Sequence, residues 1–331
     1  MYTVNKQRVE EMVKKMDKTR PIVVLTPVNR YLGFSAPVSP VEQFTEVANK
    51  WNIPVIFKDP QRLVIKADKD TKPTLYDEEG EVSGSAYFPF GHDQLDRNMV
   101  RFIITALESQ GKPVVNGEKA LTVADDKGLM ALAFAGHSDI PTAQSVIASA
   151  RGSVPRILGL LDGGDVVVTK MTGFTGGGVG TQPMQANIDY LAPSLWLSRM
   201  DSRPRVVQND ADKTSSDGAR IVIRAYIVGG KLIGCYTTAG YGLVNCAGLT
   251  RESEGRPYVA SEYEEKIFLA AAEAVGASGY CRIDAAGGNN FCIYEVNPLA
   301  RIDAEKYELD IPEAILLHAV ELATNTEGVR T

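Results

Sequence analysis

The segment from Gly279 to Ile302, GYCRIDAAGGNNFCIYEVNPLARI, constrains the fold of this chain more than any other. Its Gly-Gly-Asn-Asn run provides the positive-φ residues that a tight turn needs, so the pattern predicts two adjacent strands joined by that turn. Side chains alternate along a strand, which places Arg282 and Asp284 on one face and also gives Glu295 and Asn297 a common face. Two carboxylates and an amide oxygen are therefore expected to converge beside a guanidinium.

Hard oxygen ligands of this kind suit Mg²⁺ that is held jointly with the phosphates of a substrate. The segment therefore indicates chemistry on a nucleoside triphosphate. The alternative is an ordinary hairpin whose polar residues face water. The apolar flank CIYEV argues for partial burial, and a buried carboxylate without a partner is costly.

Length and composition define the class of protein. At 331 residues the chain is expected to form two or three domains, and its 44% hydrophobic and 23% charged residues are typical of a soluble globular protein. The net charge of −6 argues against a broad nucleic-acid footprint, which needs clustered Lys and Arg. No apolar run reaches the length of a membrane span and the first residues lack a signal-peptide core, so we expect a cytoplasmic protein without a membrane partner.

The spacing of the cysteines and histidines predicts neither a metal site nor a catalytic site. The cysteines lie singly in apolar runs without the CxxC spacing of a zinc site, which favours buried thiols on strands. The histidines are too scattered for a metal site or a catalytic triad. These residues are Cys235, Cys246, Cys281 and Cys292, and His92, His137 and His318.

The first part of the chain alternates helices and strands. Apolar and amphipathic periodicities predict helices near 9–16, 41–51 and 95–111 and strands at 21–25, 53–57 and 112–116, with a small hairpin between about 62 and 82. Alternation of this kind implies a mostly parallel open sheet, which we assign to a domain over residues 1–118.

Two further units follow. Residues 119–204 hold a helix at 124–136, then the segment DIPTAQSVIAS, a helix near 154–161 and the strand DVVVTK, which a glycine-rich turn follows. Residues 205–331 begin with a hairpin around Gly229-Gly230. They continue with a helix that has a capping box of Ser261 and Glu264, and the final helix has Asp310 as its N-cap. The polar stretch 209–219 is either a mobile connection or a plain surface loop.

Three cationic features accompany the carboxylate hairpin. Lys170 ends a buried-type strand directly before MTGFTGGGVG, where consecutive glycines let backbone N–H groups approach phosphate oxygens. Such a turn also occurs in ordinary hairpins. Lys127 begins a helix, where a solvated surface lysine is the alternative. Arg220 and Arg224 share a strand face, as either an exposed basic stripe or a cationic wall opposite the carboxylates.

Taken in order, these features resemble the ATP-grasp superfamily of carboxylate–amine ligases. The resemblance covers about residues 113–327 and rests on PVVNGEKALTVADDKGLMALAFAGHSDIPTAQ, VVVTKMTGFTGGGVG, RVVQND, IVIRAYIVGGKLIG and YCRIDAAGGNNFCIYEVN. It implies an α/β ATP-grasp architecture: an N-terminal open parallel sheet (1–118), a central lid subdomain with the glycine-rich loop (119–204) and a C-terminal subdomain with the metal site (205–331).

The resemblance also implies roles for single residues. Lys127, Lys170 and the loop glycines Gly176, Gly177 and Gly178 would bind the nucleotide phosphates, and Gln208 and Asn209 would lie near the purine. Asp284, Glu295 and Asn297 would hold Mg²⁺ or Mn²⁺. Arg282 and Arg224 would act on the substrates. Arg301 is expected from its own position, beside the metal-binding strand, either to clamp a substrate carboxylate or to pair with Asp303 or Glu305 at the surface. The chain departs from relatives at Val222, where many have an aspartate, and after Asn297, where PLARID replaces a small-residue-Pro-Gly turn.

The implied reaction joins a carboxylate to an amine at the expense of ATP. The γ-phosphate would activate the carboxylate as an acyl phosphate, an amino acid or peptide amine would attack it, and ADP and phosphate would leave. The alternatives are an ATP-grasp enzyme with another nucleophile, a kinase that stops after phosphoryl transfer, and an ATP-binding module without turnover. Small-molecule substrates are expected, and the resemblance suggests a homodimer.

Overall fold

The structure is a computed structural model of the whole chain. It describes residues 4–27, 39–90, 94–149, 153–161, 166–172, 182–186, 189, 191–192, 195, 203–209, 219–241, 255–287, 291–300, 302 and 309–327. All statements below concern these residues. No helix among them is long and apolar enough to cross a membrane.

The N-terminal region is built on a small parallel sheet. Its strand order is β2-β1-β6, with β1 pairing parallel to both neighbours. The capping box of Ser39 and Glu42 begins helix α2, as a local sequence signal can dictate. The elements are α1 (Lys6–Lys15), β1 (Ile22–Leu25), α2 (Pro40–Trp51), β2 (Val55–Lys58), β6 (Ala86–Pro89) and α3 (Gln94–Ser109).

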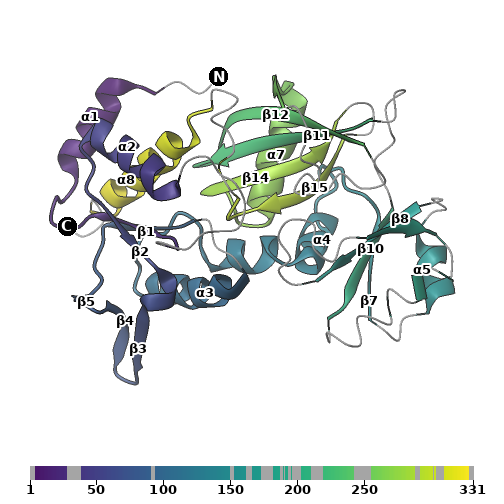
Figure 1. The fold of residues 1–331 in the computed structure, drawn as a ribbon, viewed down its shortest axis with the longest axis horizontal. Helices are drawn as coiled ribbons and strands as arrows, with labels where there is room; N and C mark the ends of the chain where they lie inside the picture. Colours follow the sequence, from purple (N-terminus) through teal and green to yellow (C-terminus); the bar gives the residue numbers. More distant parts are fainter. Residues whose placement is uncertain are drawn as a thin grey trace.

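Two details of this region differ from the sequence-based expectation. The predicted hairpin is a three-stranded antiparallel sheet that projects from the molecule (Figure 1). The predicted strand at 112–116 makes a single parallel bridge, between Val114 and Tyr87, because its next residues turn into the second region. The projecting sheet follows the 3₁₀ turn η1 (Pro60–Arg62) and consists of β3 (Val64–Asp68), β4 (Thr71–Asp77) and β5 (Gly80–Glu81).

The central region is a four-stranded antiparallel sheet in the order β7-β10-β8-β9. Strand β10 pairs with both β7 and β8, so this sheet extends past residue 204, where the proposed third unit begins. The elements are the π-helical turn η2 (Ala120–Ala124), α4 (Lys127–Ala135), β7 (Ser145–Ala148), α5 (Val154–Leu160), β8 (Val166–Met171), β9 (Gln182–Gln185) and β10 (Arg205–Asn209).

The C-terminal region contains the predicted hairpins side by side in one sheet. Its order is β13-β12-β11-β14-β15, and α7 packs against one face (Figure 1). Ser261 and Glu264 form the predicted capping box of α7, and Asp310 accepts from Glu313 N at the start of α8. The elements are β11 (Ala219–Val228), β12 (Lys231–Tyr241), β13 (Arg256–Tyr258), α7 (Glu262–Ala274), β14 (Tyr280–Ala286), β15 (Cys292–Asn297) and α8 (Ile311–Glu327).

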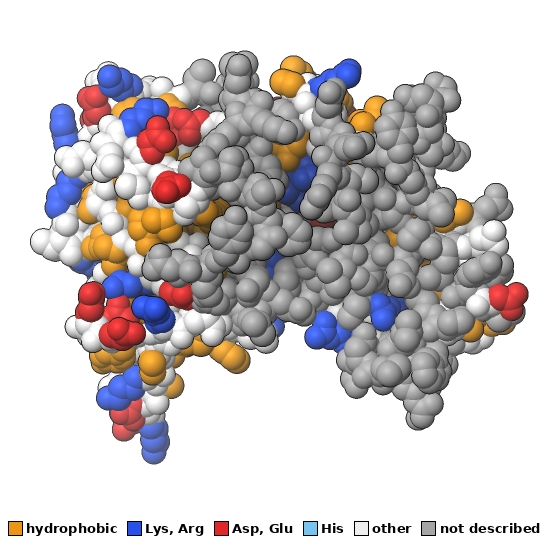
Figure 2. All heavy atoms as spheres, in the orientation of Figure 1, with side chains coloured by type: hydrophobic (Ala, Val, Ile, Leu, Met, Phe, Trp, Pro, Cys, Tyr) orange, Lys and Arg blue, Asp and Glu red, His pale blue; other side chains and the backbone are white. Residues whose placement is uncertain are grey.

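Alternation gives the C-terminal sheet two different faces. One face carries Ile223, Ala225 and Ile283, which pack in the core with α7. The other carries Arg224 and Asp284, and so presents polar groups toward the rest of the molecule. On the side drawn in Figure 2, the described surface of the N-terminal region mixes cationic and anionic side chains.

Candidate nucleotide site

Strands β14 and β15 bring together the four polar residues predicted from the hairpin. In the register, Arg282 lies opposite Asn297 and Asp284 lies opposite Glu295. The Arg282 guanidinium donates to both Asp284 oxygens, from Nε at 2.8 Å and from Nη2 at 3.0 Å. The amide nitrogen of Asn297 donates to Glu295 Oε1 at 3.0 Å. The strand alternation read from the sequence therefore placed these side chains correctly.

Lys127 joins this group from a distant part of the chain. Asp126 caps the N-terminus of α4 by accepting from the backbone N–H of Gly128 and Leu129, and Lys127 is the first helical residue. The Lys127 ammonium donates to Glu295 Oε2 in an ion pair. Only 10% of the Lys127 side chain is exposed, so the alternative of a solvated surface lysine is wrong.

The surroundings of Glu295 strongly favour its charged form. Burial raises the pKa of Glu295, but the charges of Lys127 and Lys170 and the hydrogen bonds from Lys127 and Asn297 outweigh it. The pKa of Glu295 therefore lies far below its ordinary value. The carboxylate is ionised at neutral pH and is available as an oxygen ligand.

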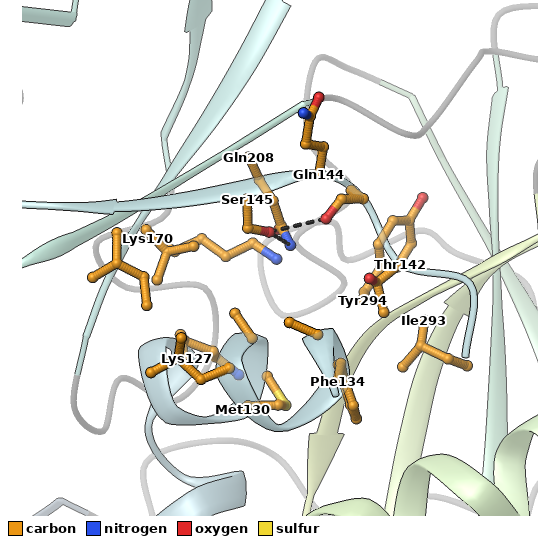
Figure 3. Close-up of a pocket in the computed structure, with 16 residues that line it drawn as sticks. Lys127, Met130, Phe134, Thr142, Gln144, Ser145, Lys170, Gln208, Ile293 and Tyr294 are labelled. Carbon is orange, nitrogen blue, oxygen red and sulfur yellow. Dashed lines mark hydrogen bonds between the residues drawn. The ribbon is translucent and has the colours of Figure 1, made fainter. Parts of the chain in front are cut away.

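A cavity of about 390 Å³ lies beside this group. Lys170 of β8 and Gln208 of β10 line one wall, and Lys127 at the start of α4 lines another (Figure 3). Met130 and Phe134 of α4 form an apolar floor beneath them. A single bridge between Thr142 and Ile293 joins the chain just before β7 to β15 at the cavity edge. The cavity thus combines an apolar slot with two cationic residues in its lining.

Arg224 lies buried next to the carboxylates. It stands opposite Asp284 in the β11–β14 register and opposite Tyr236 in the β11–β12 register. It is 8% exposed, and its guanidinium lies 5.9 Å from the centre of the Tyr236 ring. Within the described residues its Nε has no hydrogen-bond partner. An exposed basic stripe is therefore wrong for Arg224, and the side chain of Arg220 lies outside the described part of the chain.

Other predicted residues are placed elsewhere or are not described. Asn209 is absent from the cavity lining; its amide nitrogen donates to Gln144 Oε1 at 3.3 Å. Of the two residues expected near the purine, only Gln208 lines the cavity. Arg301, Gly176, Gly177, Gly178 and Cys246 lie outside the described residues. The other three cysteines are buried and reduced, as predicted.

The oxygen atoms of Asp284, Glu295 and Asn297 fit Mg²⁺ or Mn²⁺ by their chemistry. Asp284 and Glu295 stand opposite each other on neighbouring strands, and oxygen atoms are the groups that the three residues offer to a metal. Among the described residues, no group of three or more His, Cys, Asp or Glu side chains forms a metal cluster. Two carboxylates and one amide would therefore leave much of the coordination shell to phosphate oxygens and water.

Solved structures show a shared architecture, although no family model and no curated protein matches this chain. The ATP-grasp ligase PsnB, solved with a minimal precursor, Mg and ADP, is 14% identical and has a TM-score of 0.65, with 98% of this chain and 100% of that chain covered. This chain has the ATP-grasp fold. A RimK domain ATP-grasp protein from Sphaerobacter thermophilus is 14% identical, with a TM-score of 0.64 and coverage of 90% and 99%. The D-alanine–D-alanine ligase of Bacillus anthracis complexed with ATP is 14% identical, with a TM-score of 0.59 and coverage of 94% and 99%.

Several residues in and around this cavity were not predicted from the sequence. Ser145 lies in the cavity wall and accepts a hydrogen bond from Gln208. Met130 and Phe134 were recognised only as helical residues, although their spacing of four predicts a common helix face. The buried pair of Arg97 and Asp125 joins α3 to the turn before α4, and no local pattern could have predicted it.

Proposed function

We propose that this protein is an ATP-dependent carboxylate–amine ligase that forms an amide or peptide bond through an acyl phosphate and releases ADP and phosphate. One observation carries the proposal: Lys127 and Lys170 line one cavity with an apolar floor, and the Asp284–Glu295 strand pair lies beside it, with Glu295 ion-paired to Lys127. Such a cavity suits a nucleotide, with the base in the slot and the phosphates among the cations and carboxylates.

The two lysines act on the phosphates by charge. Lys170 and Lys127 lie on different walls of the cavity, so phosphates between them would be contacted from two sides. The positive charges of both lysines also lower the pKa of Glu295. Gly176, Gly177 and Gly178 follow Lys170 along the chain and are proposed to cover the phosphates through their backbone N–H groups. Catalysis in phosphoryl transfer depends mainly on such positioning and charge neutralisation.

Asp284, Glu295 and Asn297 are the proposed ligands of Mg²⁺ or Mn²⁺. When bound there, the metal would supply positive charge that neutralises the phosphates. Arg282 holds Asp284 in place through two hydrogen bonds and is proposed to stabilise the negative charge that develops on the carbonyl oxygen during amine attack. Arg224 and Arg301 are proposed to act on the substrates, Arg301 as a bidentate clamp for a carboxylate or, as the alternative, as a surface partner of Asp303 or Glu305.

The neighbours favour amino acids or peptides as substrates. PsnB was solved with its precursor peptide, MdnC is a macrocyclase bound to the precursor peptide MdnA, and a third neighbour is a D-alanine–D-alanine ligase. A kinase that stops after phosphoryl transfer, an enzyme with another nucleophile and a binding module without turnover remain the alternatives. The intact set of Lys127, Lys170, Asp284 and Glu295 supports turnover over a module without it.

The test is ADP and phosphate release from Mg·ATP in the presence of pooled carboxylates, with and without pooled amines. Hydroxylamine replaces the amine in a parallel reaction, because it converts an acyl phosphate to a hydroxamate. We expect ADP release that requires both an acid and an amine, and hydroxamate formation with the same acid. A stable phosphorylated product formed without any amine would show a kinase, and tight ATP binding without ADP release in any pool would show a binding module.

A further inference from the structure

The cavity wall holds a hydrogen-bonded pair made of Gln208 and Ser145. Gln208 on β10 lies directly opposite Ser145 on β7 in the antiparallel register, and both side chains line the cavity (Figure 3). The amide nitrogen of Gln208 donates to the Ser145 hydroxyl oxygen at 2.9 Å. A carboxamide has a donor end and an acceptor end, so its orientation decides which groups a ligand meets.

The orientation of this carboxamide is fixed by a third group. Ser145 Oγ also lies 2.9 Å from the carbonyl oxygen of Ala143, to which it donates. A carbonyl oxygen can only accept, and a hydroxyl has a single proton to give. With that proton directed at Ala143, Ser145 can only accept from Gln208. The amide nitrogen of Gln208 must therefore face Ser145.

The cavity wall consequently presents a defined pattern of hydrogen-bonding groups. No described residue donates to Oε1 of Gln208, and the second hydrogen of Nε2 is not used by Ser145. Gln208 thus offers one acceptor and one donor side by side, in the wall that also carries Lys170. An amide in this state matches the Watson–Crick edge of adenine, whose 6-amino group donates and whose ring nitrogen N1 accepts. A 6-oxo purine presents an acceptor in place of the amino group.

We infer that Ser145 and Gln208 determine the base selectivity of this site, so that 6-aminopurine nucleotides are bound and 6-oxopurine nucleotides are rejected. This rests on the proposed function, because it requires the cavity to hold the base of a nucleotide. Ser145 is the positioning residue, and Gln208 contacts the base. To bind a 6-oxo base, the Gln208 amide would have to turn over. The Gln208 Oε1 and the Ser145 hydroxyl oxygen, both acceptors, would then face each other, unless Ser145 lost its hydrogen bond to the Ala143 carbonyl oxygen.

The test compares equilibrium binding of Mg·ATP with that of Mg·ITP, whose bases differ in the amino or oxo group at position 6 and in protonation of the adjacent ring nitrogen. We expect the wild-type protein to bind ATP about 10- to 100-fold more tightly than ITP, as is typical for a paired base edge. In Ser145→Ala the Gln208 amide is free to rotate. The ATP-to-ITP ratio should then fall to a few-fold, mainly because ITP binds more tightly.

Ser153→Ala is the matched control, because Ser153 is an exposed serine of the same region without a side-chain capping bond at α5. It should keep the wild-type ratio. If Ser145→Ala does not fold, Gln208→Met provides the second variant, since it removes both polar ends and should bind ATP and ITP with similar affinity. Circular dichroism checks the fold of each variant.

Each contrary result overturns a defined claim. Equal binding of ATP and ITP by the wild-type protein, or an unchanged ratio in Ser145→Ala and Gln208→Met, would overturn the inference and leave the proposed ligase function standing. Failure of the wild-type protein to bind any purine nucleoside triphosphate would overturn the proposed function and this inference with it.

Discussion

Glu295 is the residue on which the account depends most. Its partner Lys127 is 168 residues away in the chain, and the two meet because β15 ends beside the start of α4. The side chains of Lys127 and Glu295 are 10% and 27% exposed, so removing one member of this partly buried pair leaves the other charge poorly compensated and costs more than losing a surface ion pair. The pair therefore holds a lysine ammonium against the carboxylates that the sequence alone had identified.

Arg282 provides a prediction at the same scale. We expect Arg282→Ala to bind Mg·ATP but to turn over at least about a hundredfold more slowly, because it loses a donor that acts on the developing oxyanion. Loss of such a donor lowers kcat with little change in KM. Steady-state kinetics over a range of Mg²⁺ concentrations measure both effects. Arg256→Ala, an exposed arginine on β13 of the same sheet, is the control.

The contrary outcome for Arg282 is equally specific. Arg282 donates to both oxygens of Asp284, so its loss could act through the metal ligand alone. A strongly raised Mg²⁺ requirement, with kcat restored at saturating Mg²⁺, would make Arg282 a scaffold for Asp284 and remove it from catalysis.

At the scale of elements, the sequence predicted what depends on local periodicity. The faces of β14 and β15 followed from alternation, and the start of α7 followed from Ser261 and Glu264. The pairing of strands from distant segments could not be predicted from local periodicity. Residues Arg205–Asn209, which the resemblance placed near the purine, form β10 between β7 and β8, and local patterns did not predict this because the register of non-consecutive strands is set by tertiary packing.

The turn into the second region shows another feature that local patterns do not reveal. Asn116 is fully buried; its Oδ1 accepts from Tyr280 N at 3.0 Å, and its Nδ2 donates to the carbonyl oxygens of Tyr280 at 2.7 Å and Pro298 at 2.8 Å. The backbone of Val115 comes so close that a Cβ at Gly279 would lie 1.4 Å from its carbonyl oxygen. The segment after α3 is thereby clamped to β14 and β15.

We predict that Asn116→Ala lowers the free energy of unfolding by about 3 kcal/mol, at roughly 1 kcal/mol for each buried hydrogen bond lost. Urea denaturation followed by circular dichroism measures this change. Asn49→Ala, an exposed asparagine on α2, should change stability by less than about 0.5 kcal/mol. Equal denaturation midpoints for Asn116→Ala and the wild-type protein would show that the clamp contributes nothing.

At the scale of the whole molecule, the N-terminal and C-terminal regions share one hydrophobic core. Helix α8 packs against α1, α2 and β6, and Phe88, Tyr226 and Ile315 belong to a single buried cluster. The central sheet has a separate core that includes Ile157 and Val207. The candidate nucleotide cavity lies where the central sheet meets α4 and β15, with side chains from all three in its lining.

Calorimetric titration of the protein with ATP, in Mg²⁺ and in excess chelator, tests this arrangement most directly. We predict one ATP bound per chain in Mg²⁺ and much weaker binding in chelator. We also predict loss of the Mg²⁺ effect in a folded Glu295→Ala variant, because Glu295 is a proposed metal ligand. ATP binding by Glu295→Ala with the affinity and Mg²⁺ dependence of the wild-type protein would contradict these predictions, as would binding by the wild-type protein that chelator leaves unchanged.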